Sequence, residues 1–353
     1  MKSMIEIVDG WLGERYQIAL ATVVKTWGSS PRGVGAMMII RESGEFVGSV
    51  SGGCVEGAVI EEAFKVIKYK QPSLMHFGVA NETAWEVGLA CGGEIDIYLE
   101  PLSTDHAELY HMMKTTLGDQ KSFILARVIR GASDKVGQYF FRSETSETLH
   151  RMDNSLLELV SKESDSFLKE GGSHLKEFRL DHEPIEIFFA YHGPSPKLII
   201  VGGVHIAVSL AKLAKIVGYR VIIVDPRTAF SSEERFPEVD GLVHEWPDRA
   251  LLEIGMDRST AIAVLTHDPK FDDPALQVAL PSGAFYVGAL GSRTTQEKRR
   301  QRLRDSGLSE EHLERLRGPI GLNLGGHSPE EIALSIMAEV VAVRTHSHLV
   351  QHV

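Results

Sequence analysis

The feature that most constrains the fold of this sequence is an ordered run of linker, strand, glycine pair and helix between residues 192 and 218. Residues 192–196 read His-Gly-Pro-Ser-Pro and predict a linker, because proline fixes φ and lacks an amide proton. Residues 197–201 are apolar and predict a buried strand, and a glycine pair follows directly. A helix that ends at Gly218 is then predicted by apolar residues at helical spacing: Ile206, Leu210, Leu213, Ala214 and Val217.

The remainder of the C-terminal portion continues this alternation of strand and helix. Residues 220–224, 261–265 and 285–290 predict further buried strands. Strands that alternate with helices pair in parallel through right-handed crossovers. The sequence Ser328-Pro329-Glu330-Glu331 predicts the start of the last helix, since it is a capping box with proline at the first helical position. We therefore expect residues 197–353 to form a Rossmann-type domain with a doubly wound parallel sheet.

The N-terminal portion predicts a second α/β domain over residues 1–102. Residues 17–25 predict a buried strand, residues 36–50 a hairpin and residues 55–70 a helix, with one more strand before Pro101. The middle segment, residues 103–191, is less regular, with its best strands at 123–129 and 186–191 and a polar helix at 154–170. We expect this segment to serve packing or spacing, and we find no internal repeat.

Composition excludes several functional classes. The 37 Lys and Arg residues against 48 Asp and Glu residues give a formal net charge of −11, which argues against a nucleic-acid partner. No apolar run approaches the roughly 18 residues of a membrane span, and the first residues lack the apolar core of a signal peptide. Only two cysteines occur, so a disulfide framework is not expected. These features predict a cytoplasmic protein with reduced thiols and no membrane partner.

The glycine pair Gly202-Gly203 is a candidate dinucleotide site. In such sites, glycines let backbone amides approach a pyrophosphate at the helix N-terminus, and an acidic residue holds the ribose hydroxyls. Asp225 lies 23 residues after Gly202, near the expected spacing of about 20. However, Val204 occupies the place of the second glycine of the usual motif. The pattern therefore supports the fold more strongly than it supports NAD(P) binding.

Three further loops follow strand ends of the same predicted sheet, where ligands gather in doubly wound folds. Gly291, Ser292 and Arg293 open a polar helix and are candidates for binding a phosphate through free amides and a guanidinium group. Thr266-His267-Asp268 offers His267 as an acid–base candidate, although a histidine beside an aspartate is more often a structural pair. Asp225-Pro226-Arg227 has the same placement.

Both cysteines stand beside glycine pairs. The segment Ser51-Gly52-Gly53-Cys54-Val55-Glu56-Gly57 places a thiol at the start of a helix, where the helix dipole favours the thiolate. Cys91-Gly92-Gly93 follows 37 residues later. The glycines would admit a bulky ligand close to sulfur, although two small buried residues in tight turns are also common. Gly28-Ser29-Ser30-Pro31-Arg32-Gly33 is either an ordinary turn or an anion-binding nest with Arg32 as its charged contact.

Taken together, these motifs resemble a known family, the xanthine dehydrogenase accessory factors of the XdhC/CoxI type. The resemblance covers about residues 15–102 and 196–345. Its ordered set is specific, although no single piece is. The segments that carry it are residues 28–32, 48–57, 91–93, 224–227, 266–268, 288–293, 319–322 and 328–333.

The resemblance implies a chaperone for the molybdenum cofactor, which binds the pterin cofactor and passes it to an apo xanthine dehydrogenase or a related molybdenum hydroxylase. A cysteine desulfurase and a second copy of the chain are further possible partners. Cys54 or Cys91 would approach molybdenum or its sulfur, and Cys54, Cys91 and His267 are the candidate reactive residues. The candidate contacts to the cofactor are Ser30, Arg32, Gly52, Gly53, Glu56, Gly92, Gly202, Gly203, His205, Asp225, Arg227, Asp268, Gly291, Ser292 and Arg293.

Of three alternative functions, a complete xanthine dehydrogenase is set aside, and the other two stay open. A complete xanthine dehydrogenase carries iron–sulfur clusters, each with about four cysteine ligands, and two cysteines cannot supply even one. An NAD(P)-dependent oxidoreductase is supported by Asp225 and opposed by Val204. A regulatory module that only senses a nucleotide is the third class.

Overall fold

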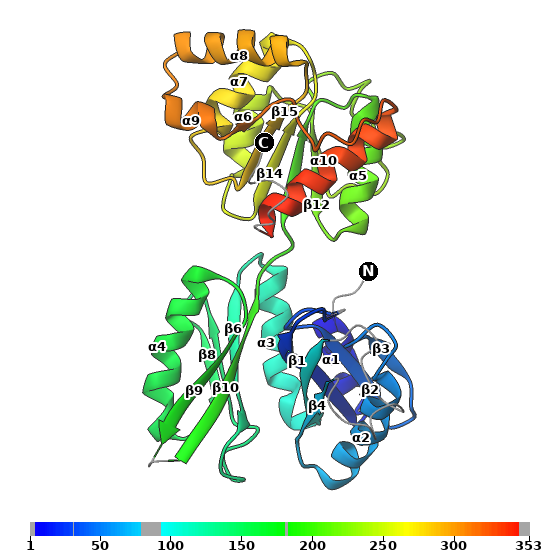
Figure 1. Cartoon of the computed structure of the whole chain (residues 1–353), viewed down its shortest axis with the longest axis vertical. Coiled ribbons are helices and arrows are strands. Elements are labelled where there is room, and N and C mark those ends of the chain that lie inside the picture. Colours follow the sequence, from blue (N-terminus) through cyan, green and yellow to red (C-terminus); the bar gives the residue numbers. More distant parts are fainter. Residues whose placement is uncertain (1–3, 31, 79–92, 181–182, 346–353) are drawn as a thin grey trace. The chain divides into compact units, whose positions relative to one another are not determined.

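The computed structural model describes residues 4–30, 32–78, 93–180 and 183–345. It divides into two compact units, residues 1–194 and residues 195–353 (Figure 1). Strand β10 continues through His192, so the segment that joins the units is shorter than the predicted linker. None of the helices in the described part of the chain combines the length and apolar character that a membrane span requires.

The second unit contains a six-stranded, fully parallel sheet. Its strand order is β13-β12-β11-β14-β15-β16, which confirms the predicted Rossmann-type, doubly wound sheet. The apolar runs identified in the sequence become its central strands. The six strands are β11 Lys197–Val201, β12 Arg220–Val224, β13 Gly241–Val243, β14 Thr260–Val264, β15 Tyr286–Ala289 and β16 Leu316–Arg317.

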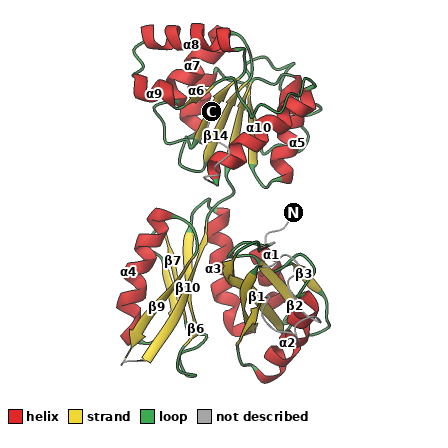
Figure 2. Ribbon diagram, in the orientation of Figure 1, coloured by secondary structure: helices red, strands yellow, loops and turns green. Residues whose placement is uncertain are grey.

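Helices cover both faces of this sheet (Figure 2). Helices α5 (His205–Ile216) and α10 (Pro329–Arg344) share one apolar core with alternate residues of β11, such as Leu198 and Ile200. Helices α6 (Pro247–Ile254), α7 (Pro269–Ala279) and α8 (Arg293–Asp305) share the other core with Ile199 and Val201. The short α9 spans Glu310–Glu314. The predicted capping box at Ser328 is present, with Glu331 as its reciprocal partner.

The first unit contains two five-stranded antiparallel sheets. The first sheet has the order β3-β2-β1-β5-β4 and is formed by residues up to Leu102. The second has the order β8-β7-β6-β10-β9 and is formed by the middle segment, for which we predicted a packing or spacing role. The elements of the first are α1 Met4–Gly13, β1 Ile18–Trp27, β2 Met37–Arg41, β3 Phe46–Gly48, α2 Glu56–Tyr69, β4 Ser73–Phe77 and β5 Glu94–Leu102. Those of the second are α3 Ala107–Gly118, β6 Phe123–Arg130, β7 Tyr139–Ser143, β8 Thr148–Arg151, α4 Asn154–Glu170, β9 His174–Leu180 and β10 Glu183–His192.

These two halves of the first unit have the same topology. Each runs helix, three strands, helix and two strands, and each arranges its strands in the same order. A register shift interrupts the first strand of each half at the equivalent place, between Val23 and Lys25 in β1 and between Val128 and Arg130 in β6. The following turns repeat the same backbone bond, from Gly35 N–H to the Val23 carbonyl and from Gly137 N–H to the Val128 carbonyl. We call residues 4–102 the first repeat and residues 104–192 the second repeat.

The finding corrects our expectation that the sequence contains no internal repeat. Visible similarity is limited to short stretches of the central strands: Leu20, Ala21 and Val23 of β1 align with Leu125, Ala126 and Val128 of β6, and Ile95 and Ile97 of β5 align with Ile185 and Ile187 of β10. The loops differ in length and composition, so a uniform period along the chain is absent. Strand pairing shows the repeat because it depends on backbone hydrogen bonds, which many sequences can form.

Each sheet of the first unit is covered by its own helix on one face and meets the other repeat on the opposite face. Ala19, Ala21 and Val23 of β1 pack with α2, whereas Ile124, Ala126 and Val128 of β6 pack with α4. The intervening residues point to the other face, as strand periodicity requires. There, a small cluster contains the equivalent pairs Val24 and Ile129, and Tyr98 and Phe188. The two repeats therefore meet through corresponding faces.

Candidate functional site

The glycine-rich motifs of the first repeat gather at one end of its sheet. Strand β1 ends at Trp27, which pairs with Glu94 at the start of β5, and Phe77 at the end of β4 pairs with Ile95. Gly48 ends β3 beside Met38 near the start of β2. Consequently the connections at residues 28–36, 49–55 and 78–93 all leave this end of the sheet. We call these three connections the motif loops.

The second motif loop, residues 49–55, is held by Glu56. Both carboxylate oxygens accept hydrogen bonds from this loop, through the hydroxyl groups of Ser49 and Ser51 and the amides of Gly52 and Gly53. Burial acts to raise the pKa of Glu56, but these hydrogen bonds hold the pKa well below its ordinary value of 4.5. Among the predicted cofactor contacts, the amides of Gly52 and Gly53 therefore donate to the carboxylate of Glu56 and do not point to a free site.

Cys54 is exposed at the apex of this loop, two residues before helix α2 begins. Its backbone amide donates to the Ser51 hydroxyl at 3.0 Å, which fixes the backbone that carries the thiol. The exposed thiol does not fit the alternative of a small buried residue in a tight turn. Cys91 and Gly92, the other predicted thiol site and its neighbour, lie outside the described residues.

Gly93 joins the third motif loop to the first. A side chain at Gly93 would come within 2.9 Å of backbone atoms of Trp27 and Ser29, so only glycine fits this contact. In the first motif loop, the Ser30 hydroxyl donates to the Arg32 carbonyl at 2.8 Å and the Arg32 side chain is exposed. The backbone of Trp27 and Ser29, directly before Ser30, is therefore packed against Gly93.

Three further residues at this end of the sheet, Trp27, His76 and Asp96, were not predicted from the sequence. The exposed Trp27 ring meets His76 edge-on at a centroid distance of 6.3 Å, and His76 Nδ1 lies 2.6 Å from the carboxylate of Asp96. Their strands are separated by about 50 residues in the chain. Only the strand pairing, which the local pattern does not reveal, brings them together.

In the second unit, the first glycine loop is closed by contacts within the chain. The Gly203 amide, which would face a pyrophosphate in a dinucleotide site, donates to Asp225 Oδ2 at 2.9 Å. A side chain at Gly202 would come within 2.6 Å of Thr266, and one at Gly203 within 2.2 Å of the Phe230 carbonyl. Here the glycines permit close packing of neighbouring loops. His205 is exposed at the start of α5.

Asp225 is fully engaged by the protein. Besides the Gly203 amide, its carboxylate accepts bonds from the backbone amide, Nε and Nη2 of Arg227 at 2.8–2.9 Å. Burial acts to raise the pKa of Asp225, but the bonds from Arg227 and Gly203 lower it overall. A ribose hydroxyl would have to displace one of these donors.

Arg227 belongs to a ladder of rings that the sequence did not predict. Its guanidinium carbon lies 4.0 Å from the ring centroid of Phe230 and 5.2 Å from that of Phe271, which in turn lies 5.3 Å from Trp246. Phe230 and Trp246 are exposed. Arg227 and Phe230 follow β12, Trp246 directly precedes α6 and Phe271 lies in the first turn of α7, so no sequence spacing reveals the group.

The second glycine loop of this unit is open. Gly291 has φ +137° and Ser292 caps α8 by accepting a bond from Thr295, and no acceptor among the described residues meets the amides of Gly291 or Ser292. Arg293 is exposed at the first position of this 13-residue helix. Free amides and an exposed guanidinium are the groups that an anion site needs, and anion binding by this loop stays a prediction.

A buried ion pair fixes the position of this open loop. Arg299 bonds to Asp272 at 2.8 Å and to the Leu290 carbonyl at 3.1 Å. Asp272 also accepts a bond from Thr266, which precedes His267 and Asp268. The exposed His267 has φ +63°, a conformation that is uncommon outside glycine, and Asp268 caps α7 through the Lys270 amide. The two loops are thus held by one network.

The two groups of predicted residues lie in different units. Ser30, Arg32, Gly52, Gly53 and Cys54 lie in the motif loops, and Glu56 begins α2 beside them. The rest of the described candidates follow the carboxyl ends of β11, β12, β14 and β15, which we call the Rossmann edge. Over the part of the chain that the structure describes, no three His, Cys, Asp or Glu side chains are grouped to hold a metal ion.

Comparisons with known proteins match both units. The XdhC Rossmann domain model matches residues 198–340, and the XdhC and CoxI family model matches residues 11–78. A Bacillus subtilis protein named as a probable subunit of xanthine dehydrogenase is 28% identical over 340 residues, which cover 96% of each chain. The molybdenum cofactor insertion chaperone PaoD of Escherichia coli is 28% identical over 327 residues, covering 93% of this chain and 83% of PaoD.

A solved structure resembles the whole chain. The crystal structure described as a xanthine dehydrogenase from Bacillus halodurans has a TM-score of 0.79 and 26% identity, and the match covers 99% of this chain and 98% of that one. The family models match the two portions that carry the first two motif loops and the Rossmann edge. The resemblance inferred from the motifs is confirmed, and the chain belongs to the XdhC and CoxI family.

Proposed function

We propose that this protein is an accessory protein that binds the molybdenum cofactor and delivers it to an apo xanthine dehydrogenase or a related molybdenum hydroxylase. The observation that carries the proposal is the exposed thiol of Cys54, held on an internally bonded glycine loop at the end of the sheet from which the first motif loop also leaves. The relative named as a molybdenum cofactor insertion chaperone supports it.

The chemistry of the loop fits a soft metal centre. A thiolate is the side chain that best matches molybdenum or a transferable sulfur, whereas hydroxyl and carboxylate groups are harder ligands. Glu56 holds the loop through its own carboxylate, so Cys54 is presented by a preformed support. Arg32, exposed on the neighbouring motif loop, offers positive charge for an anionic cargo. The cofactor is the cargo in this scheme, and Cys54 retains it without changing it.

We assign phosphate binding in the second unit to the loop of Gly291, Ser292 and Arg293. Its free amides and exposed guanidinium match a phosphate group of the cofactor or of its nucleotide form. The Gly202–Gly203 loop is the weaker candidate, because Asp225 already accepts the bond that the Gly203 amide would give to a phosphate. For the same reason NAD(P) binding is not our leading proposal. A cysteine desulfurase and a second copy of the chain are further partners within this proposal.

Cofactor retention by the full chain tests the proposal. Purified protein is incubated under anaerobic conditions with molybdenum cofactor released from a molybdoenzyme, and retained pterin and molybdenum are measured after gel filtration. We expect about one of each per chain, and strong loss of retention in Cys54→Ala and Arg293→Ala. Lys298→Ala, a change of an exposed cation on the same helix as Arg293, is the matched control.

The outcomes separate the open alternatives. Retention that is unchanged in both Cys54→Ala and Arg293→Ala would remove this site assignment. If the cofactor is not retained and a nicotinamide nucleotide binds in the micromolar range, an NAD(P)-dependent oxidoreductase becomes the better proposal. If neither cofactor transfer nor turnover is detected, a nucleotide-sensing module becomes the better proposal.

A further inference from the structure

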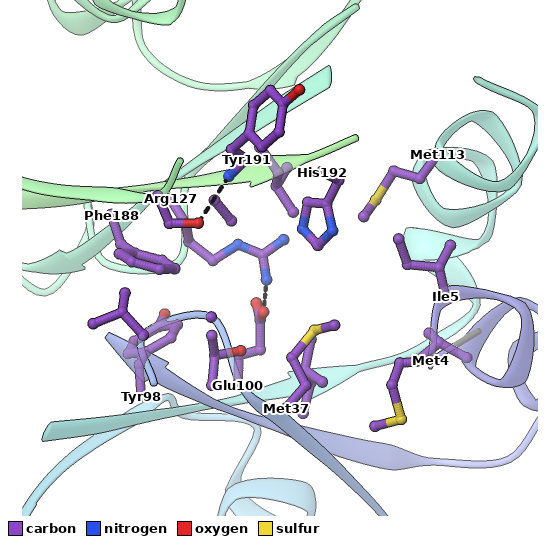
Figure 3. Close-up of a pocket in the computed structure, with 18 of the residues that line it drawn as sticks. Met4, Ile5, Met37, Tyr98, Glu100, Met113, Arg127, Phe188, Tyr191 and His192 are labelled. Atoms are coloured by element: carbon purple, nitrogen blue, oxygen red, sulfur yellow. Dashed lines mark hydrogen bonds and ion pairs between the residues drawn. The ribbon is translucent and has the colours of Figure 1, made fainter. Parts of the chain in front are cut away.

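The first unit contains a cavity of about 220 Å³ between the sheets of its two repeats. Its wall combines residues of β1 and β5 from the first repeat with residues of β6 and β10 from the second, and the helices α1 and α3 close one side. Met4, Met37 and Met113 contribute flexible, polarisable side chains (Figure 3). The volume lies below the range of pockets for drug-sized ligands but would hold about seven water molecules.

An isolated ion pair crosses this cavity. Arg127 extends from β6 and its Nη1 pairs with the carboxylate of Glu100 on β5 (Figure 3). Arg127 is 4% exposed and Glu100 is 5% exposed. Arg127 Nε and Nη2 and the hydroxyl groups of Tyr98 and Tyr110 have no hydrogen-bond partner among the described residues. Buried donors without partners are rare in folded proteins, so these groups call for acceptors that the chain does not supply.

Comparison of the repeats explains how the space arises. The residue of the first repeat that corresponds to Arg127 is Thr22, and the residue of the second repeat that corresponds to Glu100 is Ala190. Both small residues line the cavity. Matching faces of two similar sheets would otherwise fill the space evenly. The ion pair and the two small residues thus occupy equivalent positions of the two repeats, and all four line the cavity.

The charge of the cavity restricts what it can hold. Arg127 and Glu100 cancel each other, and burial lowers the pKa of His192 to about 4, so that ring is neutral at pH 7. A ligand with a full charge would lack a counter-charge in a buried, largely apolar space. A neutral ligand with carbonyl oxygens or ring nitrogens would satisfy the free donors, and a flat body would fit between Leu20, Leu125 and Phe188.

We propose that this cavity binds a neutral, planar nitrogen heterocycle that carries carbonyl oxygens, with Arg127 and Tyr98 as donors and Glu100 as acceptor. Oxopurine and pterin bases share this chemistry. Val34 lines the cavity and is 40% exposed, so the wall reaches the surface at the motif loop that also carries Arg32. The site uses none of the residues assigned to the chaperone function. An oxopurine ligand goes beyond that function, whereas a pterin ligand rests on it, because pterin is the ring system of the proposed cargo.

Calorimetric titration of the full chain tests the proposal with two probes, hypoxanthine and unsubstituted pterin. We expect one site per chain for at least one probe, and the preferred probe identifies the source of the heterocycle. Tyr98→Phe removes a single oxygen and should weaken binding about tenfold, the effect of one hydrogen bond. The double variant Arg127→Gln and Glu100→Gln keeps the charge balanced and should reduce binding by at least about thirtyfold, since it removes a charged donor and its acceptor.

Controls separate this site from the motif loops and from general damage. Arg130→Gln changes an exposed cation of the same strand, which pairs with Glu186, and should leave the affinity unchanged. Cys54→Ala should also leave it unchanged, while it removes cofactor retention. If neither probe binds, or if Tyr98→Phe binds the preferred probe as tightly as the unmodified protein does, the cavity holds only water and the proposal is wrong. Should the double variant not fold, Tyr98→Phe still decides the question.

Discussion

The two repeats of the first unit share a scaffold and differ in their loops. Between the third strand and the second helix, the first repeat has residues 49–55, seven residues, where the second has residues 152–153, two residues. Between the last two strands, the first repeat has residues 78–93, sixteen residues, where the second has residues 181–182. Both cysteines fall in the longer connections. The same sheet topology therefore carries long connections in the first repeat and short connections in the second.

The comparison indicates a division of roles. The first repeat presents the candidate site, and the second repeat closes the core behind it, as the shared cluster of α1, α3 and both inner sheet faces shows. Loops on a rigid scaffold can change without loss of the fold, because their backbone is solvated. Features that both repeats share belong to the scaffold, and features found in the first repeat alone are the candidates for function.

The largest expected effect comes from making the second repeat resemble the first at the inner face. Arg127→Thr introduces the residue of the equivalent position and leaves Glu100 buried without a partner. We expect a loss of about 3–5 kcal/mol in the free energy of unfolding, measured with urea. The double variant with Glu100→Ala should recover most of this loss. A single variant as stable as the unmodified protein would show that the ion pair does not hold the repeats together.

A smaller loss is expected from Glu56→Ala, which removes the acceptor of the second motif loop. Several hydrogen bonds to one partly buried carboxylate disappear together, and we expect the free energy of unfolding to fall by at least about 2 kcal/mol. Alkylation of Cys54 should become faster because its loop loosens. Glu61→Ala, an exposed glutamate on the same helix, is the control. Equal stability and alkylation in the two variants would contradict a holding role for Glu56.

Equivalent core positions should respond alike. Val23 and Val128 are both fully buried, each facing the helix of its own repeat. We expect Val23→Ala and Val128→Ala each to cost about 2 kcal/mol in urea unfolding, from lost burial and the cavity left behind. A difference between them of more than about 1 kcal/mol would mean that the two repeats are packed less similarly than their topology implies.

The smallest expected effect is the part of the pH dependence of stability that Glu56 contributes. The pKa of Glu56 is lowered in the folded protein, so the unfolded chain binds more protons than the folded chain below pH 4.5. The stabilisation is therefore complete above that pH and is lost as the pH falls further. We expect the stability difference between the unmodified protein and Glu56→Gln to be constant from pH 6 to 7 and to shrink below about pH 4.5. A difference that does not change with pH would exclude the carboxylate charge as its source.

Local patterns predicted the second unit better than the first. Strands β11 and β12 of the second unit coincide with their predicted ranges, because continuous apolar runs are local signals. In the first unit helix α4 does so too, since helical spacing is equally local. The antiparallel repeats were not recognised, since their similarity lies in pairing between distant strands. The motif loops were found from glycine and cysteine alone. Trp27, His76 and the ladder around Arg227 were missed because separate segments supply their parts.

The sequence by itself determined the Rossmann-type unit, the glycine-rich loops and the family to which the chain belongs. Only the tertiary structure decided which of those loops are free to bind. The Gly203 amide bonds to Asp225 and the Gly53 amide bonds to Glu56, whereas the amides of Gly291 and Ser292 have no acceptor among the described residues. A glycine permits a backbone conformation, and its sequence context predicts that much. The partner of its amide depends on which distant side chain the fold brings within hydrogen-bonding distance.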